Sequence, residues 1–138
     1  MFEYEVMTAQ HYDDAVTLWE ETVGTGPNDR KDEIMKYLER NGSMSYVCIE
    51  GTTGKVVGTV LGGTDGRHGY LYHLAVNIAF RHKGIGRTLV NLSTGAMKKE
   101  GIHRCVAGVK DGNDDFWKKI GWEKPGRLNI YSVVLQKQ

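Results

Sequence analysis

A short basic segment, Arg81–Gly86, is where residue types and spacing most clearly indicate chemistry. It reads Arg-His-Lys-Gly-Ile-Gly and directly precedes a segment with helical periodicity. A helix N-terminus has unpaired backbone N–H groups and a partial positive charge, so it stabilises a bound anion. Glycines at 84 and 86 remove the Cβ atoms that would keep phosphate oxygens away from those N–H groups. Basic side chains follow the same segment: Arg81, His82, Lys83 and Arg87. The segment is therefore predicted to neutralise two phosphates.

The standard nucleotide-binding motifs do not explain this segment. The pattern Gly-x-x-x-x-Gly-Lys-Ser/Thr occurs nowhere in the chain. The dinucleotide fingerprint fails as well, because Leu89 occupies its third glycine position and about seven residues separate the preceding strand from Gly84. Without further context, a helix with a glycine-rich start is the competing interpretation.

The other residues that often bind metals or react show no such arrangement. The five histidines at positions 11, 68, 73, 82 and 103 have no ligand spacing with cysteine or carboxylates, so no metal site is predicted. Cys48 and Cys105 each lie in an apolar, strand-like run. They are predicted to be buried thiols and not a disulfide or metal pair, which suits a reducing cytoplasm.

Length and charge limit the class of protein. The 138 residues, without low-complexity stretches, fit one domain over 1–138, and no run of 18 apolar residues marks a membrane span or an export signal. Residues 1–50 have eleven acidic and four basic side chains, and the remainder has six and fourteen. Either these are solvated faces, or the first half meets a cation and the second an anion. Nucleic-acid binding ranks lower, because the basic residues do not alternate with aromatics on one sheet.

The elements that must position the basic segment follow from periodicity, capping and turn signals. The apolar face of Tyr12, Ala15, Val16 and Trp19 indicates a first helix. The predicted helices are 8–22, 28–41, 84–100 and 114–119, and the predicted strands are 3–7, 44–50, 55–61, 70–76, 102–109 and 128–135. The order is therefore β-α-α-β-β-β-α-β-α-β, an α/β (α+β) protein.

Two motifs and this element order resemble one known family. Leu74–Leu89 resembles the acetyl-coenzyme A signature of the GNAT N-acetyltransferases, Arg/Gln-x-x-Gly-x-Gly/Ala after a Leu-x-Val strand end. Asn113–Trp122 looks like the family's later motif, an Asn followed by Phe-Tyr-x-Lys-x-Gly-Phe. Gly58–Gly66 further resembles a bacterial branch called YpeA-like. The resemblance covers nearly the whole chain and implies one GNAT domain, with a mixed, mostly antiparallel sheet of about six to seven strands flanked by helices.

The resemblance implies how acetyl-coenzyme A (acetyl-CoA) would bind. Strand 70–76 would splay from strand 102–109, and the pantetheine arm would bond to the backbone of Leu74 and Val76. The N–H groups of 82–87 would bind the pyrophosphate. The implied cofactor-binding residues are Leu74, Ala75, Val76, Arg81, His82, Lys83, Gly84, Ile85, Gly86, Arg87, Thr88, Asn113 and Trp117. Trp117 has core packing as an equal alternative.

The resemblance also limits the catalytic side chains. An amine would attack the thioester directly, with a backbone N–H near Leu74 stabilising the oxyanion. Family members often place a Glu or His base where this chain has Tyr70 and Tyr72, and neither tyrosine is a base at neutral pH. The imidazole of His73 is better suited to act as a base. On a regular strand, however, its side chain would point to the face opposite that of Tyr70 and Tyr72, and only a bulge would change this. A structural histidine is the alternative.

The usual acid, a tyrosine, is replaced by Trp117, and indole is a very weak acid. Tyr72, Tyr131 or water could protonate the thiolate instead. Predicted catalytic residues are therefore Tyr72, His73 and Tyr131.

Acceptor recognition in this family comes mainly from the first two helices and their loop. The predicted acceptor contacts are Trp19, Glu20, Glu21, Asp29, Asp32 and Tyr70. Carboxylates and an aromatic ring suit a cationic amine on a small molecule or peptide, and a solvated surface position is the equal alternative for any one carboxylate. Members of the family are frequently dimers, so a homodimer is a candidate assembly, and membranes are not expected partners. A catalytically idle acyl-CoA sensor is the alternative function.

Overall fold

The computed structural model describes residues 1–110 and 112–136, and these divide into two compact units, Met1–Gly108 and Val109–Gln138. The first unit contains the sheet and three α-helices. Its strands are β1 (Phe2–Val6), β2 (Tyr46–Glu50), β3 (Val56–Thr64), β4 (Gly69–Val76) and β5 (Cys105–Ala107). Its helices are η1 (Ala9–His11), α1 (Tyr12–Glu21), η2 (Pro27–Asp29), α2 (Lys31–Arg40), η3 (Gly42–Met44), η4 (Ile78–Phe80) and α3 (Ile85–Lys99).

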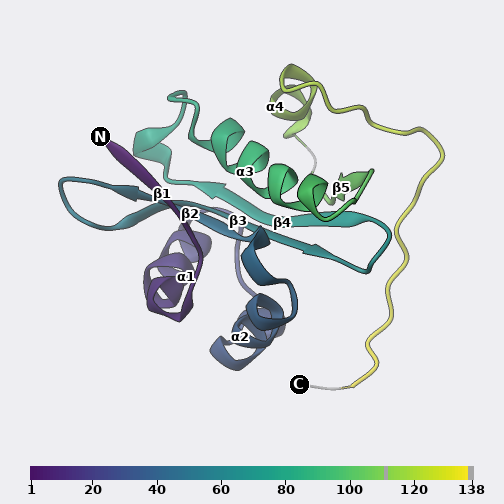
Figure 1. The fold of residues 1–138 in the computed structure, drawn as a ribbon, viewed down its shortest axis with the longest axis horizontal. Helices are drawn as coiled ribbons and strands as arrows, with labels where there is room; N and C mark the ends of the chain where they lie inside the picture. Colours follow the sequence, from purple (N-terminus) through teal and green to yellow (C-terminus); the bar gives the residue numbers. More distant parts are fainter. Residues whose placement is uncertain (111, 137–138) are drawn as a thin grey trace. The chain divides into compact units, whose positions relative to one another are not determined.

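The sheet follows chain order, β1-β2-β3-β4-β5. The first four strands are antiparallel to their neighbours, and β5 is parallel to β4. Figure 1 shows α1 and α2 on one face of this sheet and α3 on the other. The sheet thus separates two layers of helices, and residues on opposite faces of β4 meet different helices.

Both helix layers bury an apolar stripe against the sheet. On one face, α1 buries Ala15, Leu18 and Trp19. On the other face, the buried residues of α3 are Ile85, Leu89, Val90, Ser93 and Met97, which follow helical spacing. Burial of the first turn of α3 at Ile85 fixes the helix start beside the sheet, while the preceding loop stays exposed.

Strand β4 has a bulge at His73. Thr59 of β3 faces Ala75, and Leu61 faces Tyr72, so two residues of β4 lie opposite one residue of β3. His73 has φ 48°, in the left-handed region that a residue with a Cβ adopts at a cost. The bulge interrupts the alternation of side chains along β4. The alternation argument against His73 as the base therefore does not apply.

Strands β4 and β5 separate after a short stretch of pairing. The register runs from Gly69 opposite Cys105 to Leu71 opposite Ala107 and stops there, although β4 continues to Val76. Among residues 1–110 and 112–136, no strand pairs with this edge of β4 beyond Leu71. This agrees with the predicted splay of strand 70–76 from strand 102–109. The second strand is, however, only three residues long.

The second unit contains α4 (Asp114–Lys119), as predicted. The predicted strand 128–135 is wrong, because the described part of this unit contains no strand. Its apolar side chains stay exposed, from 74% at Leu128 to 92% at Tyr131. β-branched composition favours an extended chain, but a strand also needs a hydrogen-bonded neighbour. The prediction of six to seven strands is wrong for the same reason, and the described sheet has five.

The described helices include none that is long and apolar enough to cross a membrane. Cys48 is buried and Cys105 is half-buried, and both are free thiols as predicted. Burial raises the pKa of the Cys105 thiol to about 11 and also raises the pKa of Cys48. Both cysteines are therefore poor nucleophiles near neutral pH.

Candidate active site

The loop before α3 is built by local hydrogen bonds that leave the N–H groups of residues 82–87 free. The Asn77 side chain accepts a bond from the Ala79 N–H at 2.9 Å and starts η4. Gly84, at the N-cap of α3, has φ 82°, a conformation that favours glycine. The Thr88 hydroxyl bonds back to the Gly84 carbonyl at 2.9 Å. The helix therefore begins sharply, with its first N–H groups directed into the loop.

This loop has the properties of an anion site. Within the described chain, no hydrogen bond uses the N–H groups of residues 82–87. The basic side chains Arg81, His82, Lys83 and Arg87 are all exposed around them. The Arg81 Nε atom donates to the Val76 carbonyl at 3.2 Å, which ties the loop to the end of β4. Free N–H groups and cations thus surround one exposed position at the end of the open strand.

The open edge of β4 leads to this loop. The Asn77 N–H bonds to Val57 of β3 at 2.8 Å, so the neighbouring backbone groups of Val76 point away from β3. The two-residue repeat of a strand gives Leu74 the same direction. Backbone donors and acceptors of Leu74 and Val76 therefore lie along an edge that no described strand covers.

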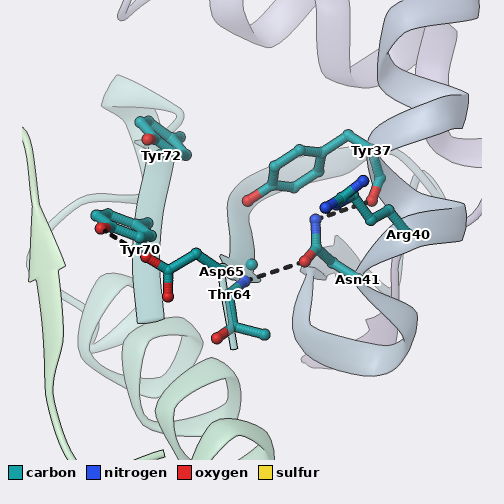
Figure 2. A pocket seen from close by; sticks show the side chains of 8 residues that line it. Tyr37, Arg40, Asn41, Thr64, Asp65, Tyr70 and Tyr72 are labelled. Atoms are coloured by element: carbon teal, nitrogen blue, oxygen red, sulfur yellow. Dashed lines mark hydrogen bonds between the residues drawn. The ribbon is translucent and has the colours of Figure 1, made fainter. Parts of the chain in front are cut away.

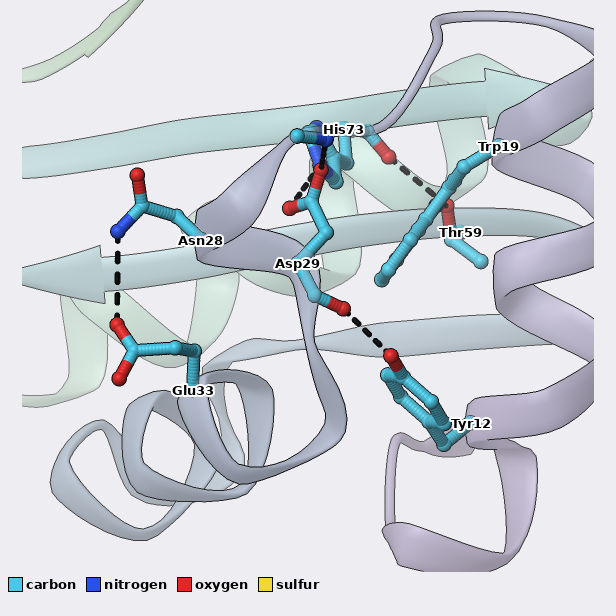
Figure 3. Close-up of polar contacts among 8 residues, drawn as sticks. Tyr12, Trp19, Asn28, Asp29, Glu33, Thr59 and His73 are labelled. Carbon is cyan, nitrogen blue, oxygen red and sulfur yellow. Dashed lines mark hydrogen bonds and ion pairs between the residues drawn. The ribbon is translucent and has the colours of Figure 1, made fainter. Parts of the chain in front are cut away.

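The bulge of β4 brings two predicted site residues together, as Figure 3 shows. His73 Nε2 and Asp29 Oδ1 lie 2.7 Å apart, although the residues are 44 positions apart in sequence. Their side chains are 24% and 13% exposed. This contact assigns Nε2 as the ring nitrogen that bears hydrogen in the neutral form, so Nδ1 holds the free lone pair. We call His73 and Asp29 the β4 dyad.

Asp29 is held in place through its side chain and through its backbone. Its Oδ2 accepts the Gly26 N–H at 2.9 Å, which closes the turn of η2. The Asp29 carbonyl accepts a hydrogen bond from the Tyr12 hydroxyl at 2.5 Å, so α1 fixes the loop between α1 and α2. The sequence suggested Asp29 as an acceptor contact. It precedes α2 without capping it and faces the histidine.

His73 is also held from beneath by Trp19 and Thr59. The Trp19 ring packs edge-on against the His73 ring, with centroids 4.6 Å apart. Trp19 Nε1 donates to Thr59 Oγ1 at 2.8 Å, and Thr59 Oγ1 donates to the His73 carbonyl at 2.8 Å. Trp19 and Thr59 are both fully buried. Trp19 therefore lies in the core under the histidine and not on a surface exposed to an acceptor.

The remaining predicted residues lie elsewhere. Tyr70 and Tyr72 of β4 line a pocket beside α2 (Figure 2), and Tyr72 is 49% exposed. Glu20 and Glu21 are exposed at the end of α1. In the second unit, Tyr131 is 92% exposed.

Two further predicted residues belong to the second unit. Asn113 Nδ2 bonds to the Lys110 carbonyl at 3.3 Å. The Trp117 ring packs on Trp122 with centroids 4.7 Å apart. Trp117 is half-buried, and α4 has no fully buried residue. Both the core-packing alternative and the cofactor role of Trp117 therefore stay predictions.

Sequence reasoning missed the partners that position His73. Tyr12 appeared only as part of an apolar helix face, and Thr59 only as a strand residue. No local pattern links these residues, because their contacts cross 14 to 44 sequence positions. Over the described ranges, no group of three histidine, cysteine or acidic side chains is arranged to hold a metal ion.

The sheet opens at β4, and its uncovered edge leads to a basic loop with free N–H groups at the start of a helix. The chain belongs to the acetyltransferase (GNAT) family, whose family model matches residues 9–122. The protein is accordingly an acetyltransferase, EC 2.3.1.-, of a family that uses acetyl-CoA.

Solved structures share this fold at low sequence identity. An acetyltransferase of Trypanosoma brucei has a TM-score of 0.75 at 18% identity, over 96% of this chain and 100% of the other. The PaiA N-acetyltransferase of Thermoplasma acidophilum, solved with coenzyme A, has a TM-score of 0.76 at 18% identity, over 89% and 90%. AAC(6')-Iy, in complex with the bisubstrate analogue CoA-S-monomethyl-acetylneamine, has 0.78 at 14% identity, over 97% and 99%.

Proposed function

We propose that the protein transfers an acetyl group from acetyl-CoA directly to a primary amine on a small cationic molecule or peptide. The observation that carries the proposal is the β4 dyad, a histidine oriented by a carboxylate at 2.7 Å, on the strand whose open edge leads to the anion-binding loop. A base beside a site for an activated acyl group is the minimum arrangement for amine acylation.

The residues of the first unit fit the donor. Free N–H groups at 82–87 and four exposed basic side chains suit a pyrophosphate, and the uncovered edge at Leu74 and Val76 suits an extended amide-containing arm. Bound acetyl-CoA would supply a thioester carbonyl as the electrophile. A backbone N–H near Leu74 would then stabilise the oxyanion. Roles for Asn113 and Trp117 in binding the donor remain part of this proposal and rest on the family resemblance.

His73 would act as the general base. The incoming amine must lose a proton to attack, and Nδ1 of the neutral ring can accept it while Nε2–H stays bonded to Asp29. The amine nitrogen forms a bond to the carbonyl carbon, and the carbon–sulfur bond then breaks. Asp29 stabilises the imidazolium that forms, so it is a positioning residue and His73 is the catalytic residue.

The proton for the departing thiolate has three sources in this proposal. Tyr72 is half-exposed and adjacent to His73, Tyr131 is an exposed hydroxyl in the second unit, and water is the third source. A thiol has a pKa near 8.5, so its thiolate leaves without strong acid assistance. Tyr72→Phe and Tyr131→Phe separate these sources, because only the variant that loses the acid should have a lower kcat.

The test is acetyl-CoA turnover across amines, followed by release of coenzyme A thiol. The set should contain polyamines, aminoglycosides, amino acids and peptide N-termini. The raised pKa values of Cys48 and Cys105 keep the enzyme's own thiols slow in a thiol-reagent assay near neutral pH. We expect turnover with cationic amines. Tight coenzyme A binding without turnover on any amine would favour the idle sensor instead.

Finer expectations from the sequence belong to the same proposal: one domain over 1–138, the YpeA-like bacterial branch, a homodimer and a cytoplasmic location. Light scattering of the purified chain tests the dimer. Cooperative unfolding of both units as a single transition tests the domain, whereas two separate transitions would contradict it.

A further inference from the structure

A pocket of about 290 Å³ lies between α2 and the ends of β3 and β4 (Figure 2). It is lined by Tyr37, Arg40, Asn41, Gly63, Thr64, Asp65, Tyr70 and Tyr72. Tyr70 and Tyr72 come from β4, the strand that also bears His73. A strand rises about 3.3 Å per residue, so Tyr70 and His73 are roughly 10 Å apart along β4. The pocket is therefore within reach of a short molecule whose other end lies at the β4 dyad.

The Tyr37 hydroxyl is buried in this pocket without a hydrogen-bond partner among the described residues. A Cβ at Gly63 would lie 2.6 Å from that hydroxyl, so glycine provides the space that the hydroxyl occupies. A buried hydroxyl without a partner costs free energy, and proteins rarely keep one without a function. The hydroxyl is packed against Gly63, and Tyr37 therefore contributes its ring to the pocket lining.

Aromatic rings and one carboxylate determine what that ligand should be. The Tyr37 and Tyr72 rings meet edge-on at 6.4 Å, and Tyr70 adds a third ring. The Tyr70 hydroxyl donates to Asp65 Oδ2 at 3.2 Å, while Oδ1 accepts the N–H groups of Arg67 and His68. Asp65 is thus an ordered anion in a pocket that three tyrosine rings also line, a combination that suits organic cations.

We propose that this pocket, the tyrosine pocket, is an acceptor subsite for the second ammonium group of a diamine or polyamine whose other amine reacts at His73. The proposal rests on the proposed function. The tyrosine rings would contact the ammonium, and Asp65 would supply the opposite charge. Arg40, at an exposed position of α2, also lines the pocket. Its positive charge would repel the ammonium.

The test compares three ligands of equal length that differ only at the far end: 1,6-diaminohexane, 1-aminohexane and 6-aminohexanoate. Their binding to the full chain is measured by calorimetry with coenzyme A present. We expect the diamine to bind at least fivefold more tightly than the monoamine, and the amino acid to bind most weakly. Tightest binding of the amino acid would overturn the proposal, since it would assign the pocket to an anion through Arg40.

Variants at two positions locate the effect. Asp65→Asn keeps an oxygen for the turn, and it should weaken diamine binding about fivefold or more without changing the monoamine. Tyr37→Leu removes the aromatic ring and should weaken the diamine severalfold, whereas Tyr37→Phe keeps the ring and should leave diamine binding within about twofold. Because Tyr37→Phe also removes the unpartnered hydroxyl, it should raise thermal stability. Glu39→Gln, at an exposed position of α2 outside the pocket lining, is the charge control.

Ligand binding tests the subsite, and turnover tests the proposed function, so the two proposals can be contradicted independently. Equal affinity for diamine and monoamine, or equal effects of Asp65→Asn on both, would overturn the subsite even if amines are acetylated. Diamine-selective binding that depends on Asp65 and Tyr37, without acetylation of any amine, would uphold the subsite and overturn the proposed function.

Discussion

The loop at 81–87 and the β4 dyad differ in the contacts that position their functional groups. The loop is one run of neighbouring residues, and the groups it offers are mainly backbone N–H groups at the start of α3. The dyad joins residues from a loop and a strand 44 positions apart, and it depends on a bulge and on the core beneath it. Substitutions that change the backbone geometry or the charge of the loop should therefore weaken coenzyme A binding. Substitutions that remove a single side-chain contact of the dyad should instead lower turnover.

The largest expected effect is in the loop. Gly84→Glu places a carboxylate at the N-cap of α3 and forces a side chain into a φ of 82°, so we expect coenzyme A binding to weaken by about 100-fold or more. Titration calorimetry measures this directly. Gly95→Glu adds the same charge to the same helix, about 15 Å further along, and should change binding little. Equal losses from both variants would mean that net charge, and not the loop, controls binding.

The sequence could predict this loop because its determinants are local. Glycines, basic residues and the helix start occur within seven residues, 81–87. The free N–H groups then follow from helix geometry alone. Most helix and strand positions could also be predicted, because periodicity is local in the same sense. The segment 128–135 could not, since its local composition favours a strand and its partner is decided by tertiary contacts.

The dyad could be predicted only in part. His73 was a candidate from its type and position, but the alternation of side chains along a strand argued against it until the bulge was known. The role of Asp29 depends on the turn of η2 and on the contact from Tyr12, neither of which has a local signal that points to His73. The hydroxyl of Thr59 and the ring of Trp19 likewise acquire their roles only when α1 packs on β3.

The next largest effect tests the dyad at His73, the proposed base. His73→Asn removes the imidazole, and asparagine tolerates a left-handed backbone better than most residues, so the bulge should persist. We expect kcat/KM for the amine to fall by about 10²- to 10⁴-fold. Coenzyme A binding should stay within about twofold of the unmodified protein, which is the contrast with Gly84→Glu. Retention of most of the activity would exclude His73 as the base.

A smaller effect is expected at Asp29. Asp29→Asn keeps the shape but loses the charge-assisted bond to Nε2, so kcat should fall roughly 10- to 100-fold. Steady-state rates with the amine measure this change, and titration calorimetry should show coenzyme A binding unchanged. Glu39→Gln, at an exposed position of α2, is the charge control. An unchanged kcat in Asp29→Asn would exclude Asp29 as the residue that positions His73.

The smallest effect on the reaction is expected beneath the dyad, at Thr59. Thr59→Val keeps the shape but leaves Trp19 Nε1 buried without its acceptor and removes the bond to the His73 carbonyl. The free energy of unfolding should fall by about 1–3 kcal/mol, which denaturant titration measures. Turnover should fall only severalfold, because the histidine and its carboxylate remain. Thr59→Ser retains the hydroxyl and should restore most of the stability. If valine costs no more than serine, the bulge is held by strand pairing and the Thr59 hydroxyl does not support the dyad.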